Sequence, residues 1–124
     1  MEPVLLLIED DDEIAEAVAL ILGEERLRVI RAPDGRSGVA AARLVNVALV
    51  LLDLTLPDVG GEQVVARLRE AGCTAPIVVL SGAADGLDRA RAVGADGFLA
   101  KPFDVDRLLE QVQQLLARHE PAQL

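Results

Sequence analysis

Four short stretches of the sequence place charged or hydroxyl side chains directly after apolar residues. These side chains belong to Glu9-Asp10-Asp11, Asp53, Ser81 and Lys101. Carboxylate oxygens suit a hard cation such as Mg²⁺, whereas a hydroxyl and an ammonium donate hydrogen bonds to an anion. If the fold gathers them, Asp53 lies between the metal side and the Ser81–Lys101 side, where its carboxylate could act as a nucleophile toward phosphorus.

Lys101 is notable for a second reason, because it is the only lysine among 12 basic residues. Lysine carries a compact ammonium, and its single use suggests that position 101 needs one. The only aromatic residues, Phe98 and Phe103, flank this lysine. Chance is the alternative explanation for the lysine, and core filling is the alternative for Phe103.

Apolar stretches alternate with helical patterns along the chain. The predicted strands cover residues 4–8, 27–31, 47–52, 76–80 and 97–100. The predicted helices cover residues 12–22, 34–44, 62–71 and 87–93, and a last helix follows Asp104. Asp34 and Asp104 are predicted helix caps, and apolar residues recur at helical spacing behind them. Residues 119–124 are expected to form a frayed tail.

The alternation of strands and helices predicts an α/β fold with right-handed parallel crossovers. Strands 4–8, 47–52 and 76–80 are unbroken apolar runs, as is typical of central strands buried on both faces. Arg28 and Arg31 in one strand, and the shortness of 97–100, mark the two edges. These constraints predict a flavodoxin-like, doubly wound (βα)5 domain whose five-stranded parallel sheet has the order 2-1-3-4-5. Its carboxyl edge would bring the reactive side chains together.

Each reactive residue also has an ordinary structural interpretation. An Asp at the end of a strand is more often a cap or turn former than a nucleophile, and for Asp11 and Asp12 we favour helix capping. Ser81 and Lys101, taken singly, are typical surface residues. Their joint placement at four strand ends favours the functional interpretation.

Composition narrows the classes of function. The 124 residues, 52 % of them apolar, predict one domain with an aliphatic core. A net charge of −9 disfavours direct nucleic-acid binding and favours a cation or basic partners. No apolar run approaches the ~18 residues of a membrane span, no signal peptide is evident, and Cys73 cannot form an internal disulfide. We therefore expect a cytoplasmic domain without membrane association, and Met1 suggests an N-terminal position.

These residues resemble the receiver domain of two-component response regulators over essentially the whole chain. The motifs that carry the resemblance are Leu7-Ile8-Glu9-Asp10-Asp11, Leu51-Leu52-Asp53-Leu54-Thr55-Leu56-Pro57, Gly60-Gly61, Leu80-Ser81-Gly82 and Gly94-Ala95-Asp96-Gly97-Phe98-Leu99-Ala100-Lys101-Pro102-Phe103. The last of these is the most specific. The resemblance predicts a receiver domain over residues 1–118, followed by a tail at 119–124.

The resemblance implies that Asp53 is the phosphoacceptor, taking its phosphoryl group from a histidine kinase or a phosphotransfer protein. Mg²⁺ would be held by Glu9, Asp10, Asp53 and the backbone carbonyl of Thr55. Lys101 would pair with the phosphoryl oxygens, and the family has a cis peptide after this lysine. Such a domain is a signalling phosphoacceptor rather than an enzyme, although it assists its own phosphotransfer and dephosphorylation.

The resemblance also implies a switch. Ser81 would move to the phosphate, Phe98 would follow it into the interior, and Thr55 and Ala83 would modulate the rate of phosphate loss. The last predicted strand and the helices on either side of it would then present a changed face to a downstream partner or output domain.

The sequence departs from the family pattern in this region. Phe98 stands where many relatives have Tyr, so a switch here would work by burial without a hydroxyl bond. Lys101 follows Ser81 by 20 positions, somewhat fewer than the pattern implies. The last helix has Arg107 and Gln111 where an acid and a base would support a dimer of DNA-binding relatives, so that dimer is not predicted.

Three other classes of protein fit the sequence less well. A flavin or nucleotide domain of this topology needs a Gly-rich phosphate loop after the first strand, where this chain has acids. An aspartyl-phosphate phosphatase of the haloacid dehalogenase type needs a second Asp where Thr55 stands. A pseudo-receiver, acting only as an interaction module, would lack the key acids or the lysine. Whether the domain is free-standing or part of a longer regulator stays open.

Overall fold

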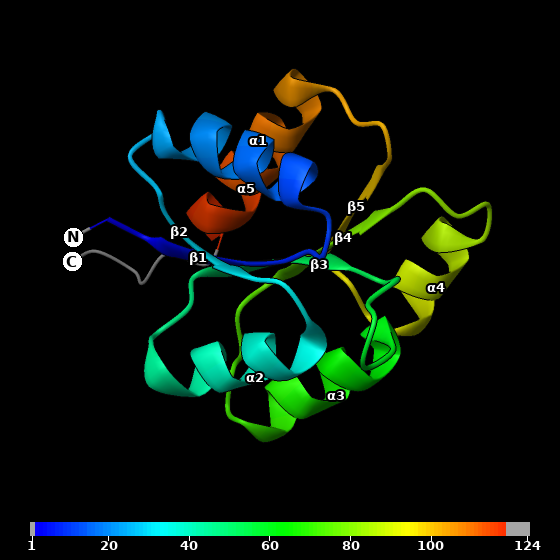
Figure 1. The fold of residues 1–124 in the computed structure, drawn as a ribbon. Helices are drawn as coiled ribbons and strands as arrows, with labels where there is room; N and C mark the ends of the chain where they lie inside the picture. The colour runs from blue at the N-terminus through cyan, green and yellow to red at the C-terminus, as the bar shows by residue number, and fades with distance from the viewer. Residues whose placement is uncertain (1, 119–124) are drawn as a thin grey trace.

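The computed structural model describes residues 2–118, which form alternating strands and helices (Figure 1). The strands are β1 (Val4–Ile8), β2 (Arg28–Ala32), β3 (Leu49–Asp53), β4 (Ile77–Ser81) and β5 (Gly97–Ala100). The helices are α1 (Asp12–Gly23), α2 (Gly35–Leu44), α3 (Gly61–Glu70), α4 (Gly86–Ala92) and α5 (Val105–Arg118). Every predicted element is present, and no end is shifted by more than two residues. The predicted tail lies outside the described residues.

The strands form one parallel sheet of order β2-β1-β3-β4-β5, which confirms the predicted fold. All residues of β3 and β4 are buried, whereas the edge strand β2 exposes Arg28 and leaves three residues half-buried. Strands covered by helices on both faces must be apolar throughout, and this accounts for the unbroken aliphatic runs.

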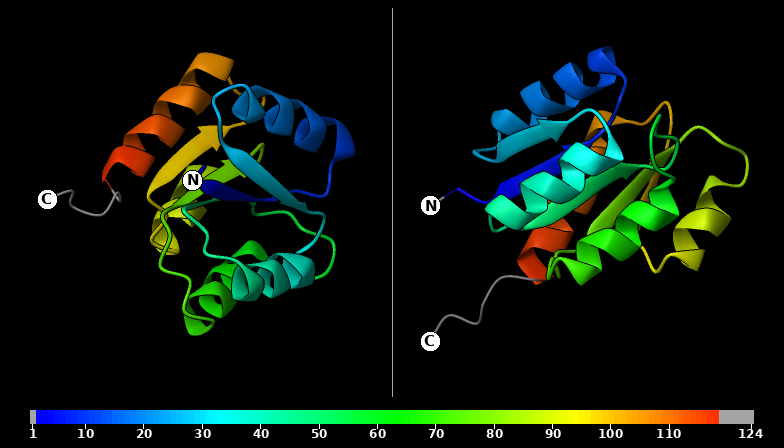
Figure 2. Two further views of the ribbon diagram at one scale, coloured as in Figure 1. Left: turned by 90° about the vertical axis from the view of Figure 1, so that its left-hand side faces the viewer. Right: turned by 60° about the horizontal axis from the view of Figure 1, so that its bottom comes forward.

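Helices cover both faces of the sheet, with α1 and α5 on one side and α2, α3 and α4 on the other (Figures 1 and 2). Successive side chains of a strand point to opposite faces. Leu51 accordingly packs with the α1–α5 layer and Leu52 with the α2–α4 layer, both fully buried. Burying one such side chain contributes roughly 1.5–3 kcal/mol, so an aliphatic core of this kind can hold the fold without aromatic residues.

Acidic side chains cap α1 and α2, as predicted. Asp11 accepts a hydrogen bond from the Ile14 N–H at 3.0 Å, and Asp34 accepts one from the Ser37 N–H at 2.8 Å. The prediction that Asp12 is also a cap is wrong. Because the cap position is already filled by its neighbour, Asp12 is the first helical residue and instead forms an ion pair with Arg31.

No helix within residues 2–118 combines the length and the hydropathy needed to cross a membrane.

Candidate functional site

The side chains predicted to be functional come from the carboxyl ends of four neighbouring strands. Asp53 ends β3, Ser81 ends β4, Glu9 directly follows β1 and Lys101 directly follows β5. In a parallel sheet these ends lie along one edge, and here β1 and β3, the strands flanking the topological switch point, carry the acids. The positions of the buried strands in the sheet thus fix the distances between these side chains.

Three carboxylates converge at this edge. Oxygen atoms of Glu9, Asp10 and Asp53 lie within 4.8 Å of one another. Glu9 has no exposed surface, Asp53 is 5 % exposed and Asp10 faces solvent. Like charges so close repel one another unless a cation compensates them.

Lys101 supplies part of that compensation. Its Nζ donates a hydrogen bond to Glu9 Oε1 and a second one to Asp53 Oδ2, the latter at 3.3 Å. Burial, together with the hydrogen bond to Asp53, raises the pKa of Glu9 to about 7 despite the nearby ammonium. Burial opposes the charged form of Lys101, but the hydrogen bond to Glu9 and the charge of Asp53 outweigh it and raise the pKa of the lysine.

The donor set fits Mg²⁺. All three groups offer hard oxygen atoms, and one ammonium leaves the cluster with excess negative charge. Within residues 2–118 the cleft above the acids is lined by Glu9, Asp10, Asp11, Ile14, Asp53, Thr55, Gly82, Ala83 and Lys101. Mg²⁺ usually takes one or two carboxylates and keeps several waters, so this open cleft leaves space for a phosphoryl oxygen.

Thr55 and Ala83 both line this cleft. The Thr55 N–H donates to Asp53 Oδ1 at 2.9 Å, which fixes one carboxylate oxygen and leaves the other beside Lys101. The loop after β3 therefore orients the Asp53 side chain.

Ser81 and Phe98 lie beside the cleft rather than in its described lining. Ser81 is 2 % exposed, and its hydroxyl oxygen accepts a hydrogen bond from the Ala83 N–H at 3.1 Å. Phe98 is half-buried against the α2–α4 layer. Both approach Gly86: a Cβ there would lie 2.7 Å from Ser81 Oγ and 3.2 Å from Phe98 Cε1. The first turn of α4 therefore contacts both residues of the predicted switch.

Two features near the site were not predicted. Asp58 accepts hydrogen bonds from the Gly35 and Arg36 N–H groups at 2.9 and 3.0 Å, which ties the loop after β3 to the start of α2. Glu62 on α3 and Arg89 on α4 form an ion pair at 2.7 Å. An acid directly after Pro57 is a signal only for a turn, and no spacing rule links Glu62 to Arg89.

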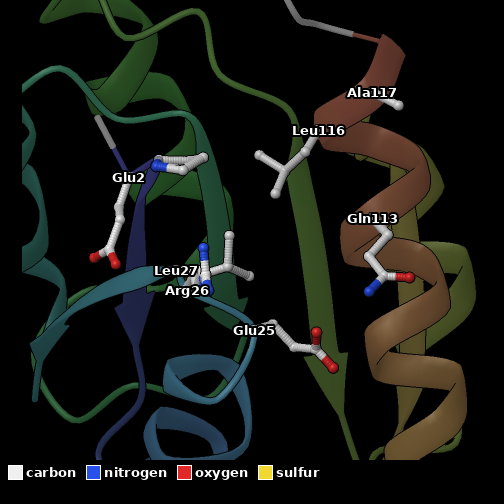
Figure 3. Close-up of a pocket in the computed structure, with 8 residues that line it drawn as sticks. Glu2, Glu25, Arg26, Leu27, Gln113, Leu116 and Ala117 are labelled. Atoms are coloured by element: carbon white, nitrogen blue, oxygen red, sulfur yellow. The ribbon is translucent and has the colours of Figure 1, made fainter.

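The opposite edge of the sheet has a different character. A hollow there lies between the start of the strands and the end of α5 (Figure 3). Its lining combines Glu2, Pro3, Glu25, Arg26, Leu27, Gln113, Leu116 and Ala117. Among the residues that the structure describes, this lining contains acidic, basic and apolar residues, and it has no group of convergent carboxylates like that at the carboxyl edge.

The family model described as the response regulator receiver domain matches residues 5–113. The chain belongs to this family. Its cluster of acids fits the phosphoacceptor site of a receiver domain in a two-component system. The family match confirms the resemblance seen in the motifs. Receiver domains are signalling phosphoacceptors rather than conventional enzymes.

Among curated proteins, the chain is similar to the cell cycle response regulator CtrA of Brucella ovis. The two are 37 % identical over 116 residues, which is 92 % of this chain and 50 % of the relative. CtrA of Brucella suis biovar 1 gives the same values. The chain thus spans about half the length of the curated relatives that it matches.

Solved receiver structures share the fold. Chemotaxis protein CheY4 of Vibrio cholerae superposes with a TM-score of 0.83 at 27 % identity, covering 93 % of this chain and 99 % of CheY4. The receiver domain of the sensor histidine kinase PA1611 of Pseudomonas aeruginosa PAO1 gives 0.85 at 27 % identity, covering 94 % and 99 %. That relative has a magnesium ion coordinated in its active site cleft.

Proposed function

We propose that Asp53 accepts a phosphoryl group from the phosphohistidine of a histidine kinase or a phosphotransfer protein, in a reaction that requires Mg²⁺. The observation that carries the proposal is the setting of the Asp53 carboxylate. Glu9 and Asp10 crowd it, and the only lysine of the chain pairs with it and with Glu9. This is the arrangement that a dianion held on a carboxylate requires.

The positions of these groups support the following reaction. An Asp53 oxygen attacks phosphorus, the new O–P bond forms as the P–N bond breaks, and the imidazole leaves with the bonding electrons and takes up a proton from solvent. The Lys101 ammonium, already beside Asp53 Oδ2, shifts to pair with the phosphoryl oxygens. Glu9, Asp10, Asp53 and the Thr55 carbonyl would hold Mg²⁺, which supplies positive charge to the transferred group.

The phosphorylated state would then move Ser81 toward the phosphate and draw Phe98 inward. Because Ser81 and Phe98 both lie against Gly86, such a movement reaches α4 directly. Thr55 and Ala83, on the walls of the cleft, are placed to limit the access of water to the phosphate. The α4-β5-α5 face would carry the change to a protein partner or an output domain.

Labelling by a small phosphodonor tests the proposal. With acetyl phosphate and Mg²⁺ the wild-type chain should gain one phosphoryl group, and Asp53→Asn should gain none, because an amide is no nucleophile here. Asp34→Asn is the matched control, since Asn caps a helix as well as Asp. Normal labelling of Asp53→Asn would refute the assignment, and unlabelled wild-type protein would favour a pseudo-receiver.

A further inference from the structure

Arg31, at the end of the edge strand β2, contacts the backbone that carries the metal-side acids. Its Nε donates to the Glu9 carbonyl oxygen at 3.0 Å, and its Nη1 pairs with Asp12 Oδ1 at 2.9 Å. These two partners stand on either side of Asp10 in the sequence. One guanidinium therefore contacts the backbone of the residue before Asp10 and the side chain of the second residue after it.

The end of β2 satisfies both polar backbone groups of Glu9. The Glu9 N–H donates to the Ala32 carbonyl at 3.0 Å, while its carbonyl accepts from Arg31. A guanidinium presents its donors in a rigid planar fork, so it can fix the direction of a backbone carbonyl in a way that an ammonium cannot. These two hydrogen bonds attach the start of the turn between β1 and α1 to the end of β2.

Stability alone does not account for this contact. Within residues 2–118, Nη2 of Arg31 is buried without a hydrogen-bond partner, which costs free energy. The Asp12 side chain is 80 % exposed, and ion pairs of this kind contribute little. A fixed positive charge beside the acids also opposes the binding of a cation.

We propose that Arg31 is a positioning residue of the metal site, which orients the Glu9-Asp10 turn so that both carboxylates can hold Mg²⁺. This inference rests on the proposed function. Groups behind the ligands of a metal typically contribute about 10- to 100-fold to its affinity. Two effects of removing Arg31 on Mg²⁺ affinity have opposite signs. If Arg31 positions the ligands, its loss weakens Mg²⁺ binding. If Arg31 acts only through its positive charge, its loss tightens Mg²⁺ binding.

The test is isothermal titration of Mg²⁺ into the full chain and its Arg31→Met variant. The variant is expected to bind about tenfold more weakly. Arg28→Met is the matched control, because Arg28 is an exposed arginine of the same strand and its loss removes the same charge. It should stay within about twofold of the wild type. Equal or tighter binding by Arg31→Met would overturn the proposal.

A second variant guards against misfolding. Arg31→Lys keeps the charge and loses the planar fork, so it should still bind Mg²⁺ at least about threefold more weakly than the wild type. Wild-type affinity in Arg31→Lys would overturn the role of the fork. Circular dichroism establishes that each variant is folded before titration.

Labelling with acetyl phosphate separates positioning from general damage. In Arg31→Met the Mg²⁺ concentration for half-maximal labelling should rise about tenfold, with the rate at saturating Mg²⁺ within about twofold of the wild type. A lower saturating rate at an unchanged Mg²⁺ requirement would overturn the inference. If wild-type protein is not labelled at all, the proposed function fails, and the titration of Mg²⁺ still decides the role of Arg31.

Discussion

The carboxyl edge of the sheet has two halves that are built differently. The metal half, named for the proposed Mg²⁺ site, consists of Glu9, Asp10 and Asp53 at the ends of β1 and β3. The switch half, named for the proposed movement, consists of Ser81, Phe98 and α4. In the metal half the Thr55 N–H holds the Asp53 carboxylate, and the Ala32 carbonyl and the Arg31 guanidinium hold the backbone of Glu9. The helix that follows it is capped by Asp11.

The switch half has fewer constraints. Helix α4 has only seven residues, and Asp85 at its N-cap position makes no capping hydrogen bond from its side chain. An ion pair with α3 and the close contact of Gly86 with Ser81 hold α4 in place. The difference suggests a division of roles: the rigid half keeps its oxygens in position for chemistry, and the weakly held half can change position at a small free-energy cost.

Removing the cation that compensates the metal half should have the largest effect. Lys101→Met leaves Glu9 and Asp53 as close, buried carboxylates without their shared ammonium, so without Mg²⁺ the free energy of unfolding should fall by about 3 kcal/mol. Because the chain has no Trp and no Tyr, urea unfolding is followed by circular dichroism.

Arg67→Met is the control for the Lys101 variant, because it removes an exposed cation from α3. A loss as small for Lys101→Met as for this control would show that solvent, not the lysine, compensates the acids.

The second largest effect is expected in the switch half. Gly86→Ala places a methyl group 2.7 Å from Ser81 Oγ and 2.8 Å from Ser81 Cβ, so α4 must shift. We expect a loss of about 1–3 kcal/mol and faster amide exchange confined to α4. In the control, Gly82→Ala, the nearest atom is Lys101 Cβ at 3.7 Å, and the change should be below about 0.5 kcal/mol. If Gly86→Ala and Gly82→Ala unfold with the same free energy, α4 does not pack closely against Ser81.

The smallest effect should come from Asp10→Asn in the metal half, and its sign should depend on Mg²⁺. Without the ion, removing one of three crowded carboxylates should stabilise the chain by about 1 kcal/mol or less, since solvent screens this acid. With Mg²⁺ the variant should gain less stability than the wild type. The control is Glu16→Gln, an exposed acid of α1. If Asp10→Asn is less stable than the wild type without Mg²⁺, the three carboxylates do not repel one another as described.

The fold was predictable because its signals are local. Unbroken aliphatic runs identified β1, β3 and β4 as central strands, and the parallel order placed Glu9, Asp53, Ser81 and Lys101 at one edge. Strand ends were shifted slightly, as in β3, which begins at Leu49 rather than at position 47. The edge position of β2 was inferred from its arginines.

Contacts made across elements were not predictable. Arg31 was interpreted as the mark of an edge strand, and its hydrogen bond to the Glu9 carbonyl depends on how β2 ends beside β1. Asp58 lies five residues after Asp53, but its partners belong to α2. The contact between Gly86 and Ser81 depends on where a short helix docks. Sequence periodicity contains no information about such pairs.

The most direct test of the central claim is to locate the phosphoryl group. Protein treated with acetyl phosphate and Mg²⁺ is reduced with borohydride, which converts an aspartyl phosphate to homoserine, and the peptides are sequenced by mass spectrometry. The arrangement of Glu9, Asp10 and Lys101 around one carboxylate predicts homoserine at position 53. Homoserine at Asp10 or Asp11, or its absence from protein that has taken up phosphate, would contradict this account.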